Sequence, residues 1–233
     1  MQKKYKGILL YTKVYKENDL IIKFLSNTDE IISGIVYGGL SKKKKNILQV
    51  GFFLNFNVSK IFNKPATISA ELSEPLISSI IDNKYKLNCL LSVISLINLS
   101  IIEGQTVKNI FIIKKDFLKI MIIKKNWISL YCIFLFNLLK IIGYAIDAKD
   151  SGIFKYFDLE KSEFSLTKTK HTIEFPFDLL NNKLSSNSYK SINNFFIIFE
   201  NIYNKNHLSD LNLQLPNHYH YFKELIIKFF ENK

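Results

Sequence analysis

The chain has 233 residues, of which 48% are hydrophobic, and a formal net charge of +12 at pH 7. This length allows one large domain or two modest ones, and the hydrophobic content excludes an intrinsically disordered chain. The excess positive charge favours a polyanionic partner, either a nucleic acid or an anionic membrane surface.

Residues 7–80 show the pattern of β-strands. Short apolar runs with partial alternation are separated by Asn, Asp, Gly and Lys residues. Strands are predicted within residues 7–15, 20–27, 31–39, 52–62 and 66–74, with a lysine-rich loop at 41–46. This strand content fits a small closed barrel, the OB-fold among them, because closure removes exposed sheet edges.

Beyond residue 80 the apolar runs lengthen and follow helical spacing. Helices are predicted around residues 87–101, 109–123, 127–142, 188–203 and 219–231, and Gly143 suits the end of the third one. Residues 150–178 are mixed, with strand-like pieces at 155–159, 163–166 and 172–175. The prediction is an α+β chain with an OB-type barrel domain at 1–80. An all-helical domain with a small β insertion would follow at 81–233.

Two apolar runs, 87–102 and 127–142, could suggest membrane spans. Both contain polar residues and fall short of about 18 uninterrupted apolar residues, so buried helices are the better interpretation. The basic start lacks the apolar stretch and cleavage site of a signal peptide. Cys89 and Cys132 lie in apolar runs without a CxxC pair, which predicts buried, reduced thiols in a cytoplasmic protein.

All 32 basic residues are lysine. Without the forked guanidinium of arginine, sequence-specific reading of guanine edges is disfavoured. The many Ile, Asn, Lys, Phe and Tyr residues also indicate AT-rich codon usage, which raises lysine content whatever the function. The positions of the lysines are therefore more informative than their total.

The segment SKKKKN at 41–46 is the most concentrated charge in the chain. It falls between two predicted strands, where a barrel of this kind places the loops that flank its binding face. Two interpretations stay open: a loop that contacts phosphates, and a solvated loop enriched by codon usage. Single-strand-binding barrels also stack bases on exposed aromatic side chains beside a basic groove. The candidate nucleic-acid contacts are Lys13, Lys42, Lys43, Lys44, Lys45, Lys60, Lys64, Tyr11, Tyr15 and Tyr37.

The sequence offers little for catalysis. It contains no phosphate-binding loop, no dinucleotide fingerprint and no nucleophile or zinc-protease motif. His218 and His220 flank Tyr219, but no third metal ligand lies near them in the sequence. We therefore expect no enzyme activity, no metal and no cofactor.

Three further features make the pattern specific. They are Tyr15–Asp19 after the opening strand, Gly38–Ser41 before the lysine run, and LQVGF at 48–52, all within the segment 6–56. This segment resembles the N-terminal domain of the RecO family of DNA repair proteins. LLKIIGYAIDA at 138–148 resembles a helix end in the same family.

The resemblance implies an OB domain that binds single- and double-stranded DNA and promotes annealing. It further implies a nucleoid-associated protein that works with RecR and with the acidic tail of single-stranded DNA-binding protein, and that helps to load recombinase. Lys13 and Lys42–Lys45 would contact phosphates, and Lys124, Lys125 and Lys140 are candidates for the acidic tail. Because 147–152 has no Cys, the zinc site of many members is not expected. An RNA-binding OB protein and a membrane-associated helical protein are the alternatives.

Overall fold

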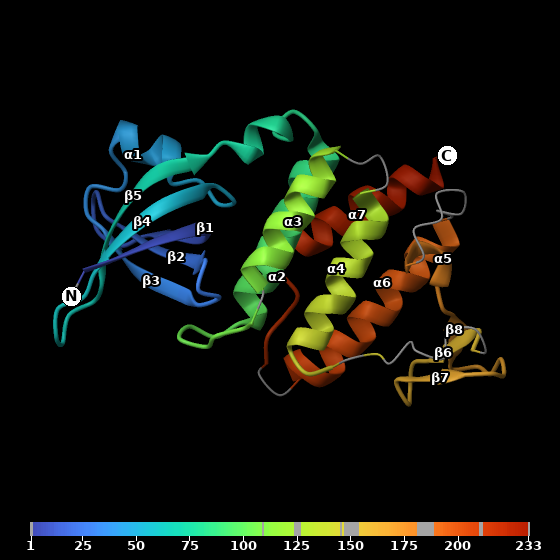
Figure 1. Ribbon diagram of the computed structural model, residues 1–233. Helices are drawn as coiled ribbons and strands as arrows, with labels where there is room; N and C mark the ends of the chain where they lie inside the picture. The colour runs from blue at the N-terminus through green and yellow to red at the C-terminus, as the bar shows by residue number, and fades with distance from the viewer. Residues whose placement is uncertain are drawn as a thin grey trace. The chain divides into compact units, whose positions relative to one another are not determined.

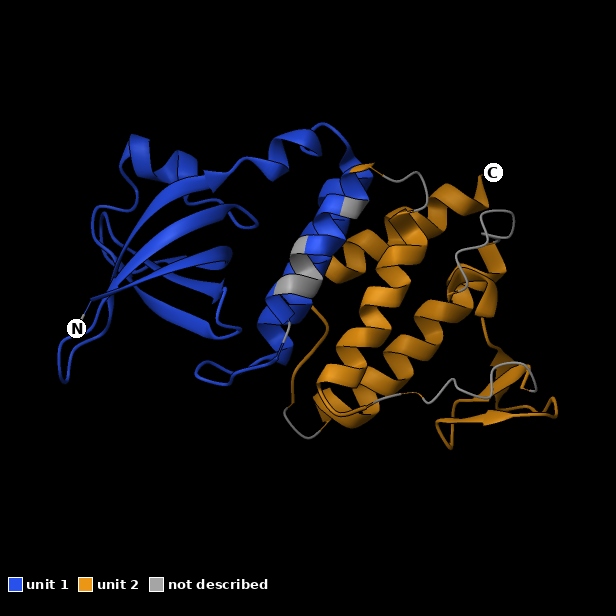
Figure 2. Ribbon diagram, viewed as in Figure 1, with its two compact units in different colours: residues 1–122 blue, residues 123–233 orange. Residues whose placement is uncertain are grey.

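The computed structural model describes residues 2–108, 110–123, 127–144, 146, 154–180, 189–209 and 212–232, without the side chains of 112–115 and 120. The chain divides into two compact units, residues 1–122 and 123–233, shown in blue and orange in Figure 2. Each unit has its own core and is described by itself.

Unit 1 begins with five strands that close into a barrel in the order β1-β2-β3-β5-β4 (Figure 1). The strands are β1 (Gln2–Val14), β2 (Leu20–Ser26), β3 (Ile31–Val36), β4 (Phe53–Ser59) and β5 (Thr67–Glu74). All neighbours pair antiparallel except β3 and β5, which run parallel and meet at Ile35 and Thr67. The expected strands are thus confirmed, and β1 begins five residues earlier than predicted.

The long strand β1 belongs to both sides of the barrel. Its first half pairs with β4, from Gln2–Ser59 to Ile8–Phe53, and its second half pairs with β2. The register with β2 shifts between Leu9 and Tyr11, so that Leu10 has no cross-strand partner. This β-bulge bends the strand and changes which side chains face outward beyond it.

The barrel interior is filled by apolar side chains from every strand. Phe24 and Phe56 stack at its centre, with ring centroids 3.8 Å apart, and Tyr5 packs at the edge of the same cluster. Each fully buried side chain of this size contributes about 1.5–3 kcal/mol from removal of its surface from water. Gly34 is required where β3 meets β5, because a Cβ there would lie 2.5 Å from the Ala66 carbonyl oxygen.

Helices follow the barrel in unit 1. They are α1 (Lys42–Ile47) between β3 and β4, the short 3₁₀ helix η1 (Leu76–Ser79), α2 (Lys84–Ser100) and α3 (Ile110–Ile123). The side chain of Asn83 caps α2 by accepting a hydrogen bond from the Lys86 amide, as expected of Asn at this position.

The predicted domain limit at residue 80 differs from the end of the compact unit at 122. Strands do give way to helices near residue 80, but α2 and α3 pack against the barrel and belong to the same compact unit. Phe111 packs edge-on against Phe53, and its amide donates to the Asp29 carboxylate at 3.0 Å. A change in secondary structure along the sequence therefore does not mark the boundary of packing.

Unit 2 is built on α4 (Trp127–Ile141), α6 (Tyr189–Tyr203) and α7 (Asn217–Glu231), with a short α5 (Phe177–Leu180). A π-helical turn, η3 (Asn204–Leu208), extends α6. The three long helices share an aromatic core, in which Tyr131 lies edge-on to Phe222 at 4.7 Å and Phe196 packs against Tyr219. The predicted helices are confirmed, and Gly143 adopts a positive φ of 97° just after α4.

Three short strands form a small sheet in the order β7-β6-β8: β6 (Tyr156–Asp158), β7 (Glu163–Ser165) and β8 (Thr172–Glu174). Phenylalanine rings attach this sheet to the helices. Phe175 stacks on Phe136 of α4 with centroids 5.8 Å apart, and Phe136 meets Phe195 of α6 at 4.9 Å. The predicted β insertion is therefore present and is packed onto the helical core.

Both cysteines are buried, and neither forms a disulfide, as predicted. Burial raises the pKa of the Cys132 thiol, which keeps it protonated and unreactive. Among the helices of the described residues, none is long and apolar enough to cross a membrane.

Candidate nucleic-acid interface

The lysine run at 42–45 is helical, which corrects the predicted loop. It forms α1, in which the Lys45 and Leu48 amides donate to the carbonyls of Ser41 and Lys44 at 2.9 Å. The buried Leu48 anchors the end of the helix. Six residues are too few to show a periodic apolar pattern, so sequence alone gave no helix signal.

Helical geometry separates the four lysines, because successive side chains turn by about 100°. Lys42 and Lys45 share one face, whereas Lys43 points elsewhere. All three are exposed. The Lys44 ammonium instead donates to the Tyr37 carbonyl oxygen at 2.6 Å, which holds α1 against the end of β3.

Two turns of the barrel are joined beside α1. The amide of Gly38 donates to the Asp19 carboxylate at 2.8 Å, and the amide of Leu40 donates to the Asn18 carbonyl at 3.1 Å. The β1–β2 turn (15–19), the β3–α1 turn (37–41) and α1 therefore form one connected surface, which we call the turn–helix rim. It carries the exposed rings of Tyr15 and Tyr37 together with the α1 lysines.

Next to the rim, the outer face of β1 and β2 presents further candidates. Tyr11 and Lys23 are cross-strand partners, and the Lys23 ammonium lies 6.0 Å from the centroid of the Tyr11 ring. Lys13 follows Tyr11 by two residues and points to the same face, because side chains alternate along a strand. The bulge at Leu10 places both on the outside of the barrel.

The β4–β5 loop (60–66) carries Lys60 and Lys64, and both are exposed. Between them Phe62 is 89% exposed, the most exposed of the large hydrophobic side chains of the described residues. An aromatic ring flanked by two lysines suits base stacking beside phosphate contacts. Phe62 was not among the predicted contacts, because a Phe in a strand-like segment more often fills a core.

The β4–β5 loop ends beside β3, whose last residue precedes Tyr37. The Ile35 amide donates to the Ala66 carbonyl at 2.8 Å where β5 begins beside β3. The last residue of the loop thus lies next to Ile35. The barrel candidates therefore lie on adjoining segments of one unit.

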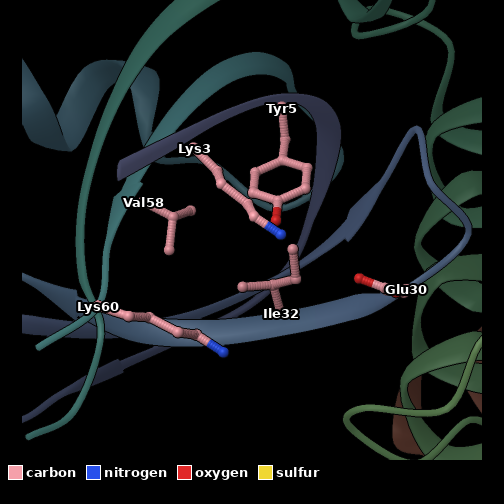
Figure 3. Close-up of a pocket in the computed structure, with 6 residues that line it drawn as sticks. All are labelled: Lys3, Tyr5, Glu30, Ile32, Val58 and Lys60. Carbon is pink, nitrogen blue, oxygen red and sulfur yellow. The ribbon is translucent and has the colours of Figure 1, made fainter. Parts of the chain in front are cut away.

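A pocket opens at the mouth of the barrel, between β1, β3 and β4 (Figure 3). Its volume is about 180 Å³, and it is lined by Lys3, Tyr5, Glu30, Ile32, Val58 and Lys60. Lys3 and Tyr5 extend into the same space, and Lys60 and Glu30 stand on opposite sides of Ile32 in this view. Only Lys60 of this set was predicted. Lys3 and Tyr5 were missed because the predicted strand began at residue 7.

The charge of the chain is concentrated in the barrel. Residues 2–74 contain 12 lysines and 6 acidic residues, so this third of the chain holds half of the formal net charge of +12. A local excess of this size attracts polyanions and accelerates their encounter with the protein. A surface that combines lysines with exposed tyrosines can hold phosphates and stack bases without reading sequence.

The candidates in unit 2 are less informative. Lys140 is exposed in the last turn of α4, whereas Lys124 and Lys125 lie outside the described residues. The segment 147–152, where no zinc site was expected, also lies outside the described residues. His218 and His220 are exposed on α7. Among the described residues no three His, Cys, Asp or Glu side chains come together as a metal site would require.

Comparison with known proteins connects this surface to a family. The family described as "Recombination protein O N terminal" matches residues 1–74, which are the barrel strands. The DNA repair protein RecO of Rickettsia canadensis is 31% identical over 148 residues, which cover 63% of this chain and 61% of that protein. The aligned length exceeds the barrel, so the similarity continues into the helical part. The resemblance to the RecO family is therefore confirmed.

Proposed function

We propose that this RecO-family chain is a DNA repair and recombination protein, and that its OB-type barrel binds single- and double-stranded DNA without sequence specificity. The observation that carries the proposal is the turn–helix rim. It joins the exposed Tyr15 and Tyr37 to the lysines of α1 through defined hydrogen bonds. The protein acts by binding and not by catalysis.

The composition of the rim decides the mode of binding. Each lysine offers a point charge to a phosphate and cannot form the bidentate pair by which arginine recognises guanine. Binding energy then comes mainly from the release of counterions from DNA, which does not depend on base sequence. Tyrosine rings add stacking on unpaired bases, and such stacking favours single strands.

Strand annealing follows from this kind of surface. A binder that neutralises phosphates lowers the repulsion between complementary strands, and it leaves the pairing edges of most of the bases free. Cooperation with RecR, binding of the acidic tail of single-stranded DNA-binding protein near Lys140, and loading of recombinase are part of the same proposal. They rest on the family resemblance and not on the rim.

The decisive experiment measures DNA affinity against salt. A variant with Lys42, Lys43 and Lys45 changed to Gln keeps helix-forming side chains and the Lys44 contact, but it removes three exposed charges. We expect the affinity to fall by about 30-fold or more at low salt. The slope of log affinity against log salt should fall by about 2 to 3 units, because each lost phosphate contact removes about 0.7–0.9.

A matched control changes three exposed lysines of the small sheet region to Gln: Lys161, Lys168 and Lys170. This control has the same net charge as the rim variant. Equal losses of DNA affinity in the two variants would mean that the overall charge, and not the rim, binds DNA. That result would contradict the proposal. RNA of the same length and sequence belongs in the same series, because a strong preference for RNA would favour an RNA-binding protein.

A further inference from the structure

The pocket at the barrel mouth combines three kinds of surface around one space. Tyr5 supplies an aromatic ring, Ile32 and Val58 supply a buried apolar floor, and two lysines stand at the edge with one carboxylate. Strand register brings them together, since Lys3 pairs with Val58 across β1 and β4 and Tyr5 pairs with Phe56. Planar apolar faces with a few placed polar groups are typical of small-ligand sites.

The size of the space limits its occupant. Its volume is about 180 Å³, and an apolar cavity of about 150 Å³ in another protein holds one benzene molecule. The space is therefore large enough for a single heterocyclic ring. The ring of Tyr5 packs on the core of the barrel beside Phe24, with centroids 6.2 Å apart, so it offers a fixed platform.

The charges in the pocket give such an occupant an orientation. The Lys3 and Lys60 ammonium groups attract a phosphate, and the Glu30 carboxylate repels one. Glu30 is held in place by Thr106, whose hydroxyl donates to it at 3.4 Å and whose backbone forms a β-bridge with it. A carboxylate accepts hydrogen bonds only, and it pairs well with the exocyclic amino group of cytosine.

We propose that the barrel mouth binds one unpaired nucleotide of a bound DNA strand. Its base lies on Tyr5 with an amino edge toward Glu30, and its phosphate lies between Lys3 and Lys60. The inference rests on the proposed function and adds a local preference to it. Cytosine is favoured over thymine, which has no amino group to donate. The surrounding nucleotides are held by charge alone, so the preference is modest.

The test compares oligo-dC and oligo-dT of about 12 nucleotides, a length within the site size of an OB-type barrel, on the full chain. We expect the wild-type protein to bind oligo-dC about five-fold more tightly or better, because one carboxylate–amino pair discriminates by at least this factor. Glu30→Met should remove the difference. Glu71→Met, on the exposed outer face of β5, should keep it.

Neighbouring lysines of β1 give a second pair of matched variants. Lys3 lines the pocket, whereas Lys4 is the next residue and points to the opposite face of the strand. Lys3→Gln should weaken binding of both oligonucleotides several-fold more than Lys4→Gln does. Tyr5→Leu should weaken binding by about five-fold or more through lost stacking, and Tyr5→Phe should not.

The outcomes separate this inference from the function on which it rests. The proposed nucleotide site would be overturned, and DNA binding left intact, by either of two results. One is salt-dependent binding with equal affinity for the two oligonucleotides, and the other is an equal loss of affinity in the two lysine variants. Absence of DNA binding by the wild-type chain would overturn both. Direct binding of deoxycytidine monophosphate at millimolar concentration, without binding of strands, would assign the pocket to a free nucleotide, against the proposal.

Discussion

The two units place several of their tyrosine side chains differently. The barrel places aromatic side chains on its surface, with Tyr11, Tyr15, Tyr37 and Phe62 all exposed. In the helical unit, by contrast, Tyr131, Tyr203 and Tyr219 are almost inaccessible to solvent. A composition rich in lysine and aromatic residues thus supplies a binding surface where strands and turns present it, and a core where amphipathic helices enclose it.

Charge shows the same contrast. In the helical unit, Lys223 of α7 meets Glu200 of α6 with nitrogen and oxygen 2.7 Å apart, and both are largely buried. Lys190 pairs with Glu174 at 2.6 Å. In the barrel, the lysines of α1 face solvent, apart from the one bonded to a backbone carbonyl. Location in the chain, and not lysine content, therefore distinguishes a structural charge from one offered to a partner.

A single substitution can destabilise the helical unit alone. Phe222 is fully buried and contacts Tyr131 and Trp127. Phe222→Ala should lower the free energy of unfolding by about 3–5 kcal/mol, through lost burial and a cavity. Thermal unfolding by circular dichroism measures this loss, and the neighbouring exposed Tyr221→Ala serves as the control. Comparable losses in both variants would contradict the assigned core.

In the barrel, a destabilising change is one that adds a methyl group where β3 and β5 are closely packed. In Gly34→Ala the new Cβ would lie 2.5 Å from the Ala66 carbonyl oxygen and 2.8 Å from the Ile68 side chain. We expect destabilisation of about 1–3 kcal/mol, because β5 must move away from β3. DNA affinity should fall as well, since the β4–β5 loop moves with β5. Ser69→Ala on exposed β5 is the control, and an unchanged melting temperature for Gly34→Ala would exclude tight closure at this point.

The last predicted change, and the smallest, is a loss of stability at acidic pH. The hydrogen bond from Lys190 lowers the pKa of Glu174 below its ordinary value of 4.5. The stabilising effect of the pair is therefore complete above that value and is lost as the pH falls through the lowered pKa. Both side chains are exposed, so the effect stays below about 1 kcal/mol. The difference in melting temperature between wild type and Glu174→Gln should be present at neutral pH and absent in strong acid.

Much of the fold could be predicted from the sequence, because strands and long helices leave a periodic signal. Alternating runs located the strands, and spacing at three and four residues located α2, α4, α6 and α7. The helix α1 could not be found in this way, since four adjacent lysines have no apolar face. The extent of unit 1 was also hidden, because the contacts between Phe111, Phe53 and Asp29 join segments far apart in the sequence.

The candidate site was only partly predictable for a related reason. Exposed tyrosines and the lysine run could be read from local composition, and they lie together on the rim. The mouth of the barrel depends on register: Lys3 reaches Val58 only because β1 continues to Gln2 and pairs with β4. The basic N-terminal segment has no alternating apolar pattern that predicts this pairing, so Lys3 and Tyr5 were not among the predicted contacts.

The bulge at Leu10 in β1 marks the place where this strand can change in length. Residues 8–10 are all buried, and the outward alternation of Tyr11 and Lys13 starts only after the extra residue. Loss of Leu10 would keep the facing of Tyr11 and Lys13, because Leu9 and Tyr11 already pair with consecutive residues of β2. Loss of one residue between Tyr11 and Val14 would instead reverse the facing of every side chain from that point to the first turn. Insertions in the exposed part of the loop, 60–65, would leave the strands unaffected. Across homologous sequences, gaps should therefore accumulate in the loop and at the bulge, and avoid the rest of β1.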